Sequence, residues 1–456
     1  YSFEINKKCE AFFLLCLSAL RGLNITFRSG LKKLNIRIKK QNMQPVEPLI
    51  IKTYKAAIDL RNSTDKQIKA ALQSIADGLL QNTATILKAN AKDLAKQDPD
   101  NPRNDRLMLN EQRIQNIAKS IRNISKLPNP AGIKLQERIL PNGLQLQKIS
   151  VPMGVVGAVF ESRPNVTFDI AALCLRSQNG CLLKGSSDAD ETNKAAIKII
   201  KNALLKNDIN PNCVTLLPSD REAVKELFTA TRYVDVIIPR GSDGLIRYVR
   251  ENSRVPVIET GAGVCHIYVE KEADIKKAVD IVVNAKVSRP SVCNAVDAIL
   301  VDENIAPEFL EKLKPGLDKY HVEILADKKA YKLLKGYPNL VTATAEDFGR
   351  EFLSLKCAIK IVKDTDEALQ HIQKYSTKHS EAIVSENKKQ CARFLKEVDA
   401  AAVYSNASTR FTDGEEFGLG AEIGISTQKL HARGPFALEK LVTEKWVIKG
   451  NGQIRE

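Results

Sequence analysis

Short apolar runs alternate with amphipathic stretches along the chain from about Gly154 onward. Apolar runs bounded by turn residues are typical of strands buried in a parallel sheet, and the amphipathic stretches are typical of the helices that cover it. The pattern therefore predicts an α/β fold with doubly wound sheets. The first series of strands is predicted at Val155–Phe160, Cys181–Lys184, Val214–Leu217, Val234–Ile238 and Val255–Ile258. The helices between them are predicted at Val166–Arg176, Thr192–Lys206, Arg221–Ala230 and Gly244–Arg250.

A second α/β series begins at His266. Its strands are predicted at His266–Val269, Ala298–Val301, Val322–Leu325, Ala358–Val362, Ala382–Val384 and Ala401–Tyr404. Its helices are predicted at Ile275–Val287, Pro307–Leu317 and Lys388–Val398. Two such domains suggest that one binds a cofactor and the other carries the chemistry, beyond the carboxyl ends of the strands.

Helices precede the first sheet, and a hairpin follows them. The helices are predicted at Ile50–Leu60, from a cap at Ser63–Asp65 to about Leu80, at Thr83–Lys96 and within 107–126. Polar and apolar residues alternate on both sides of Asn142-Gly143, which predicts a hairpin of Lys134–Leu140 and Leu144–Ile149. Such ribbons commonly extend a partner's sheet, so we expect a homo-oligomer, either a dimer or a tetramer. A surface hairpin without that role is the alternative.

Composition is that of an ordinary globular protein, with 456 residues of which 43% are hydrophobic and 27% charged. No apolar run approaches the ~18 residues that span a membrane, so no membrane partner is expected. The nine cysteines form no C-x-x-C pair, which favours a reducing compartment, here the cytoplasm. The five histidines are dispersed and H-E-x-x-H is absent, so no metal site is expected.

The basic charge is concentrated at the start of the chain. Residues 1–42 carry nine Lys or Arg and two Glu, so +7 of the formal +15 lies there. The remaining excess is modest for a large surface, which favours solvation or an anionic small substrate over nucleic acid. We interpret residues 1–42 as an extension, disordered or not native, before a working start at Met43; a targeting segment is the minority alternative.

Cys293 is the candidate nucleophile. It lies in Ser288-Arg289-Pro290-Ser291-Val292-Cys293, where the Pro-Ser pair is expected to open a helical turn. A cation such as Arg289 and a helix N-terminus both favour thiolate, which is the reactive form of cysteine.

The ends of the predicted strands carry polar side chains. Arg163 and Asn165 follow the first strand, and the amide of Asn165 is suited to an oxyanion, with a helix N-cap as its alternative. Lys184-Gly185-Ser186 ends the second strand; a lysine and hydroxyls there favour the 2′-phosphate of NADP, with a solvated turn as the alternative. Gly241-Ser242 precedes a helix and is a weak signal for an anion site.

Further candidates lie in the second half of the chain. Glu259 is a candidate general base if it lies near a cysteine. Two C-terminal stretches are rich in hydroxyls, cations and glycine, which suit the anchoring of carboxylate or phosphate. Their candidate residues are Ser408, Arg410, His431 and Arg433.

These stretches together resemble the γ-glutamyl phosphate reductase family, the glutamate-5-semialdehyde dehydrogenases of the aldehyde dehydrogenase superfamily. The segments that carry the resemblance, in the family's order, are Val155–Asp169, Ser288–Ala295, Asn406–Asp413 and Ser426–Gly434. The resemblance covers about residues 50–456. It implies a Rossmann-type NADP-binding domain, an α/β catalytic domain and a small hairpin or oligomerisation element. Their expected bounds are 43–132 with 151–262, 263–435, and 133–150 with 436–456, respectively.

The resemblance also implies a reaction, the reduction of L-glutamyl 5-phosphate with NADPH to glutamate 5-semialdehyde and phosphate, in proline biosynthesis. It implies that Cys293 is the nucleophile, Asn165 the oxyanion donor, and Lys184 and Glu351 ligands of the cofactor riboses. Glu259 aligns with the hydrolytic base of oxidising relatives, but a reductive reaction needs no activated water, so we expect it to face the cofactor or be structural. Arg163 and Arg289 are expected to help phosphate leave.

Two alternatives stay open at this point. One is an oxidising or CoA-acylating aldehyde dehydrogenase that uses the same cysteine. The other is a binding protein without catalytic activity, for which the basic charge suggests nucleic acid as the ligand. The body of the chain lacks a basic stripe with interleaved aromatics, which argues against it. A contact with glutamate 5-kinase, the kinase of the pathway, is also left open.

Overall fold

The computed structural model describes residues 45–99 and 104–455. The extension expected at residues 1–42 and the start at Met43 lie outside the described residues. No described helix combines the length and the apolar character needed to cross a membrane.

The first sheet is parallel and four-stranded, in the order β5-β4-β3-β6. Its strands are β3 (Val155–Phe160), β4 (Gly180–Lys184), β5 (Val214–Leu216) and β6 (Val236–Arg240). The fifth predicted strand, Val255–Ile258, is wrong as a strand, because it forms only an isolated bridge between Val257 and Ile237. Pro256 accepts a bond from Ile237 N through its carbonyl, but it has no N–H to extend the ladder.

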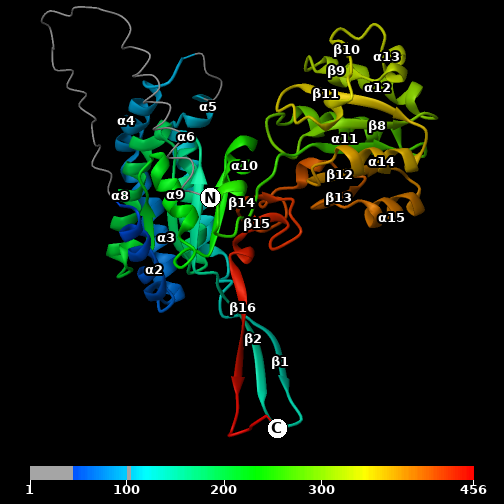
Figure 1. Ribbon diagram of the computed structural model, residues 1–456. Helices are drawn as coiled ribbons and strands as arrows, with labels where there is room; N and C mark the ends of the chain where they lie inside the picture. The colour runs from blue at the N-terminus through cyan, green and yellow to red at the C-terminus, as the bar shows by residue number, and fades with distance from the viewer. Residues whose placement is uncertain (1–44, 100–103, 456) are drawn as a thin grey trace, which may run out of the picture. The chain divides into compact units, whose positions relative to one another are not determined.

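Helices cover both faces of this sheet (Figure 1), and the apolar side chains of β3 accordingly point into a core on each face. Val156 and Ala158 pack into one core and Val155 and Val159 into the other, because successive side chains of a strand point to opposite faces. The helices that precede the sheet are α2 (Glu47–Leu60), α3 (Asp65–Gln81), α4 (Thr83–Leu94), α5 (Asn104–Leu107) and α6 (Glu111–Lys126). Those that alternate with its strands are α7 (Pro164–Arg176), α8 (Asp190–Lys206), α9 (Arg221–Thr229) and α10 (Asp243–Asn252).

Local capping explains where two of these helices begin. Thr64 caps α3, and its side chain and that of Gln67 satisfy each other's backbone N–H in a capping box. The helix predicted within 107–126 is present as α6, which starts where Asn110 accepts from Arg113 N, after the short α5 has ended at Leu107.

The second sheet is seven-stranded and parallel, in the order β10-β9-β11-β8-β7-β12-β13. Its strands are β7 (Cys265–Val269), β8 (Val296–Asp302), β9 (Glu323–Ala326), β10 (Leu340–Thr342), β11 (Lys356–Val362), β12 (Ser380–Val384) and β13 (Ala402–Ser405). Its helices are α11 (Ile275–Val287), α12 (Ala306–Asp318), α13 (Lys328–Leu333), α14 (Thr365–Tyr375) and α15 (Lys388–Glu397). The pattern did not predict β10, α13 or α14; β10 is an edge strand that is mostly exposed and so lacks an apolar run.

The predicted hairpin is present and gains a third strand. β1 (Lys134–Ile139) pairs antiparallel with β2 (Gln145–Pro152), and β2 pairs antiparallel with β16 (Val442–Lys449) (Figure 1). Gly143 has a φ of 84°, the left-handed conformation that a tight turn requires and glycine adopts without strain.

The C-terminal segment returns to the first core before it forms β16. It contains the antiparallel pair β14 (Glu422–Ser426) and β15 (Gly434–Ala437). Ile423 and Phe436 pack with the core of the first sheet, although the expected bounds placed Ile423 in the second domain and Phe436 in the hairpin element. The short 3₁₀ helices are η2 (Ser187–Ala189), η3 (Pro211–Cys213), η4 (Glu346–Gly349), η5 (Thr409–Phe411) and η6 (Leu438–Lys440).

Candidate active site

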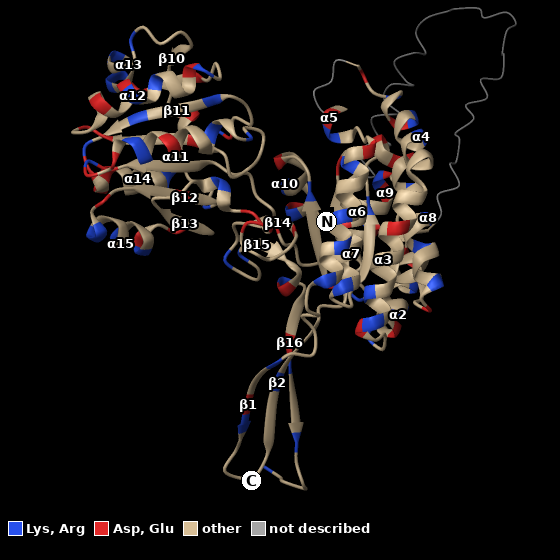
Figure 2. Cartoon of the chain, turned by 180° about the vertical axis from the view of Figure 1, so that it is seen from behind, with Lys and Arg blue, Asp and Glu red and all other residues tan. Residues whose placement is uncertain are grey.

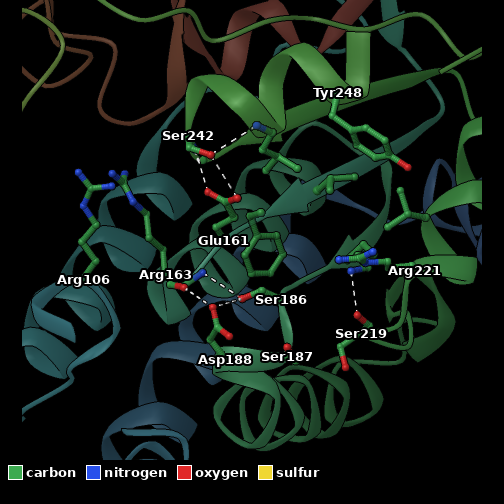
Figure 3. A pocket seen from close by; sticks show the side chains of 17 residues that line it. Arg106, Glu161, Arg163, Ser186, Ser187, Asp188, Ser219, Arg221, Ser242 and Tyr248 are labelled. Carbon is green, nitrogen blue, oxygen red and sulfur yellow. Dashed lines mark hydrogen bonds between the residues drawn. The ribbon is translucent and has the colours of Figure 1, made fainter. Parts of the chain in front are cut away.

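A cavity of about 430 Å³ opens at the carboxyl ends of β3, β4 and β6 (Figure 3). This is the edge at which open α/β sheets bind their ligands. Among its lining residues are five that the sequence proposed, which are Arg163, Lys184, Ser186, Gly241 and Ser242. These residues meet because each lies at or just after the end of a strand of the same sheet.

The end of β4 supplies cationic and hydroxyl groups to this cavity. Lys184 Nζ donates to the carbonyl of Ser219 at 3.0 Å, and burial lowers the pKa of this lysine. Arg221, at the start of α9, lines the cavity beside Ser219 in Figure 3. Gly185 does not line it; a Cβ there would lie 2.4 Å from Asn193 Nδ2, so its role is close packing against α8.

The start of α10 forms another wall. Ser242 caps the helix, and Glu161 accepts from Ser242 N at 2.8 Å and from its hydroxyl at 3.3 Å. A Cβ on Gly241 would lie 2.6 Å from Glu161 Oε2, so the glycine leaves room for that carboxylate. A negative charge is favoured at this position because it faces the positive end of the helix dipole.

Cys293 lies in a turn between α11 and β8, not in a helix. The helical turn expected after Pro290 is therefore wrong; the bond from Ala295 N to Val292 O closes a single tight turn. The backbone of Gly263 passes so close that a Cβ there would lie 1.6 Å from the carbonyl oxygen of Cys293. Cys265, at the start of β7, donates its thiol to the same carbonyl at 3.2 Å. The turn is thus held through its backbone by the segment 263–265.

The environment of the Cys293 thiol also differs from the expectation. Burial raises its pKa to about 12; the charge of Arg240 opposes this, whereas Glu351 and Glu422 add to it. Arg289, the cation expected from the sequence, is exposed, and the cation with the largest effect on the thiol is Arg240.

Asn165 lies inside the first turn of α7, so the alternative that it caps this helix is wrong. Its Nδ2 donates to Asp169 Oδ2 at 2.9 Å. Burial raises the pKa of Asp169 to about 6, and Asn165 and Arg240 act in the opposite direction. The bond fixes the amide of Asn165 and leaves its second N–H for another acceptor.

Glu351 and Glu259 have different partners. Glu351 Oε1 accepts from Gly263 N at 2.9 Å, and burial raises its pKa. Glu259 Oε2 accepts from Arg250 Nη1 at 3.2 Å. Neither lines the cavity at the ends of β3, β4 and β6. The bond to Gly263 places Glu351 against the segment that holds Cys293.

Several arginines act on one another around the thiol. Burial lowers the pKa of Arg163 to about 10; the positive charges of Arg240, Arg106 and Arg289 act in the same direction and Cys293 in the opposite one. Arg410 donates to Ser288 Oγ at 3.0 Å and also to Asn294 Oδ1, so it holds the turn on either side of Cys293.

The other C-terminal candidates are engaged elsewhere. The hydroxyl of Ser408 accepts from Arg410 N at 3.3 Å and starts η5. Arg433 Nη2 lies 2.8 Å from Asp399 Oδ1, and His431 Nε2 lies 2.8 Å from the carbonyl of Lys440. Neither His431 nor Arg433 is among the groups whose charge acts on the Cys293 thiol.

Arg240, Asp169 and Glu422 were not among the site residues proposed from the sequence. Arg240 directly precedes Gly241-Ser242 at the end of a predicted strand, and this position is the signal that could have indicated it. Glu422 lies between the two C-terminal candidate stretches; its Oε2 is buried without a hydrogen-bond partner, and burial raises its pKa to about 7. No local pattern marks such a residue.

Comparison with known proteins is consistent across sequence and structure. The model of the aldehyde dehydrogenase family matches residues 37–330. The gamma-glutamyl phosphate reductase of Bacteroides thetaiotaomicron is 52% identical over 403 residues, covering 88% of this chain and 96% of that protein. The one from Bacteroides fragilis is 53% identical over 398 residues, covering 86% and 95%.

A crystal structure of gamma-glutamyl phosphate reductase from Thermotoga maritima has a TM-score of 0.87 and 43% identity, and the match covers 91% of this chain and 100% of that one. The aligned regions cover nearly the whole chain, so they include both sheets and the ribbon β1-β2-β16. The chain belongs to the aldehyde dehydrogenase family and, within it, to the gamma-glutamyl phosphate reductases.

Proposed function

We propose that this protein reduces L-glutamyl 5-phosphate to L-glutamate 5-semialdehyde and phosphate with NADPH, as a step of proline biosynthesis. The observation that carries the proposal is the cluster of arginine charges around a single thiol. Arg163, Arg240 and Arg410 all interact with Cys293. A substrate with a phosphoryl group and a carboxylate is strongly anionic, and guanidinium groups suit both anions. The names of the relatives agree with this substrate.

The cavity at the ends of β3, β4 and β6 is suited to the cofactor. Its cations Lys184 and Arg221 and the hydroxyls of Ser186 and Ser187 favour a 2′-phosphate over free ribose hydroxyls. The nearby acid, Asp188, already accepts from Ser162 Oγ at 2.8 Å. When bound there, NADPH supplies the hydride that reduces the acyl group.

Cys293 is proposed to attack the acyl carbonyl as a thiolate. A bond forms between sulfur and the acyl carbon, and the bond from that carbon to the phosphate oxygen breaks. The Asn165 amide, fixed by Asp169, and the Cys293 backbone N–H stabilise the oxyanion. Phosphate departs as an anion beside Arg163 and leaves a thioester. After the reduction, the carbon–sulfur bond breaks and returns the thiolate.

Glu259 is proposed to be structural in this reaction. An oxidising enzyme needs a base to deliver water to the thioester, but here Arg250 holds the Glu259 carboxylate at 3.2 Å. Restricting activated water protects the thioester from hydrolysis, which would waste the acyl phosphate.

The test uses the reaction in reverse, with glutamate 5-semialdehyde and NADP⁺. Reduction of NADP⁺ should require inorganic phosphate, because phosphate releases the acyl group from Cys293. Cys293→Ser should abolish turnover, and Cys391→Ser, a matched change of a partly exposed thiol on α15, should leave it intact. Rates that do not depend on phosphate, or that rise with CoA instead, would contradict the acyl-phosphate assignment.

A further inference from the structure

Arg240 occupies a junction between the cofactor sheet and the turn of Cys293. It is the last residue of β6, paired in register with Phe160 of β3. Its carbonyl accepts from Glu161 N at 3.1 Å, in the loop that leads to Asn165. Its side chain therefore leaves the sheet at the carboxyl edge, where ligands bind.

The guanidinium lies across a glycine of β14. A Cβ on Gly424 would lie 2.3 Å from Arg240 Nη1, 3.1 Å from its Cζ and 2.6 Å from Thr260 Cγ2. Any other residue at 424 would displace the guanidinium or the threonine. The absence of a side chain at Gly424 thus creates the space that Arg240 occupies.

The charge of Arg240 is not paired with another side chain of the described residues. Its side chain forms neither a hydrogen bond nor an ion pair within residues 45–99 and 104–455. Arg410, by contrast, donates to Ser288 and Asn294. Burial lowers the pKa of Arg240, and the charges that oppose this are, in order, those of Cys293, Glu422 and Asp169. Of these charges, that of Cys293 has the largest effect on Arg240.

We propose that Arg240 is a positioning residue that stabilises the Cys293 thiolate by its charge, and that Gly424 is required as glycine to admit its guanidinium. The inference deepens the proposed function, since it rests on Cys293 being the nucleophile. Arg240 acts through the sulfur and exchanges no proton. This arrangement replaces the expected helix N-terminus and Arg289 as the source of positive potential.

The other charges around Cys293 come from several elements and set the background for the test. Arg163 is the N-cap residue of α7 and Asp169 lies within that helix. Arg410 lies on η5, Glu351 precedes β11 and Glu422 lies on β14. The two glutamates raise the pKa of the thiol, so they cannot replace Arg240.

Alkylation of Cys293 by iodoacetamide as a function of pH tests the inference without substrate or cofactor. Each protein is the full chain, and the modified residue is identified by mass spectrometry. Arg240→Gln should shift the pH profile upward by about one unit, because an opposite charge has been removed. Below the midpoint the thiolate fraction falls about tenfold, while its intrinsic reactivity rises about threefold, so alkylation should slow about threefold.

Two further variants separate charge from packing. Arg240→Lys retains the charge and should keep most of the wild-type profile. Gly424→Ala keeps the arginine but displaces it, and should shift the profile in the same direction as Arg240→Gln, with thermal melting as the control for folding. Arg393→Gln, which removes an exposed cation on α15, should leave the profile unchanged.

An unchanged profile in Arg240→Gln, or an equal shift in Arg240→Lys and Arg240→Gln, would overturn the inference. Failure of the proposed function gives a different result. In that case the profiles shift as expected, but reduction of NADP⁺ with glutamate 5-semialdehyde does not depend on phosphate.

Discussion

At the scale of single residues, the candidate site is defined by charges whose cost of burial is only partly offset. The Cys293 thiol, the Asp169 carboxyl and the Glu422 carboxyl all have pKa values raised chiefly by burial. Arg240 opposes the shift in each of them. Groups with strongly shifted pKa values are concentrated at functional sites, because catalysis requires buried ionisable groups that destabilise the fold.

The cost of burying the Glu422 carboxyl can be tested through the pH dependence of the free energy of unfolding. Its pKa is about 7 in the folded protein and 4.5 as the ordinary value, so between these pH values the folded state binds more protons than the unfolded state. The contribution of Glu422 should therefore make stability fall as pH rises through this interval. Glu422→Gln should remove this contribution, so that the change in stability from pH 5 to pH 7, measured by urea unfolding, differs from that of the wild type by about 2 kcal/mol. Identical pH dependence in the variant and the wild type would contradict the assignment.

At the scale of elements, the ribbon β1-β2-β16 has two properties that a monomer does not explain. Its outer strands, β1 and β16, each have one edge without a partner within the described chain. It also exposes apolar side chains, among them Ile139 at 70% and Ile448 at 59%. Unpaired edges and exposed apolar residues mark an interaction site, so we propose that a second copy of this chain covers the ribbon.

Disruption of the ribbon surface should change the oligomeric state. Ile448→Asp places a charge on β16 and should lower the molar mass measured by light scattering after size exclusion. Leu205→Asp, at an exposed apolar residue on α8 with 58% exposure, is the matched control and should leave the mass unchanged. A wild-type protein that is already monomeric would exclude the proposed assembly.

At the scale of the whole molecule, one sheet supplies the cavity proposed for the cofactor and the other carries the thiol. The cavity forms at the edge of β3, β4 and β6, and Cys293 precedes β8 of the seven-stranded sheet. Arg163 connects the cavity with the thiol, because it lines the cavity and interacts with Cys293. Figure 2 shows cationic and acidic residues mixed over the helices that cover both sheets, which does not favour the nucleic-acid alternative.

This division predicts that cofactor binding and thiol reactivity can be changed separately. Arg221→Ala removes a cation from the cavity and should raise the Kd for NADPH about tenfold, because a charged hydrogen bond contributes about 1.5 kcal/mol or more. The Kd for NADH should change little, and the alkylation rate of Cys293 should stay as in the wild type. Equal losses for both cofactors would contradict a role at the 2′-phosphate.

Much of the fold follows from local patterns. The alternation of short apolar runs and amphipathic stretches located most strands and helices of both sheets, because burial on two faces leaves a strong signal. Asn142-Gly143 located the ribbon's turn for the equally local reason of backbone conformation. The strand at Val255–Ile258 was overpredicted because Pro256 lies within an apolar run, and β10 was missed because its exposure leaves no such run.

The sequence by itself also determined which residues stand at the strand ends, and so five of the residues that line the cavity proposed for the cofactor. Only the tertiary structure decided the surroundings of Cys293. Arg240, Gly263 and Glu422 reach the thiol or its turn from separate strands and loops, and no spacing along the chain records that meeting. The effect of a charge depends on distance and burial, and both are properties of the folded chain.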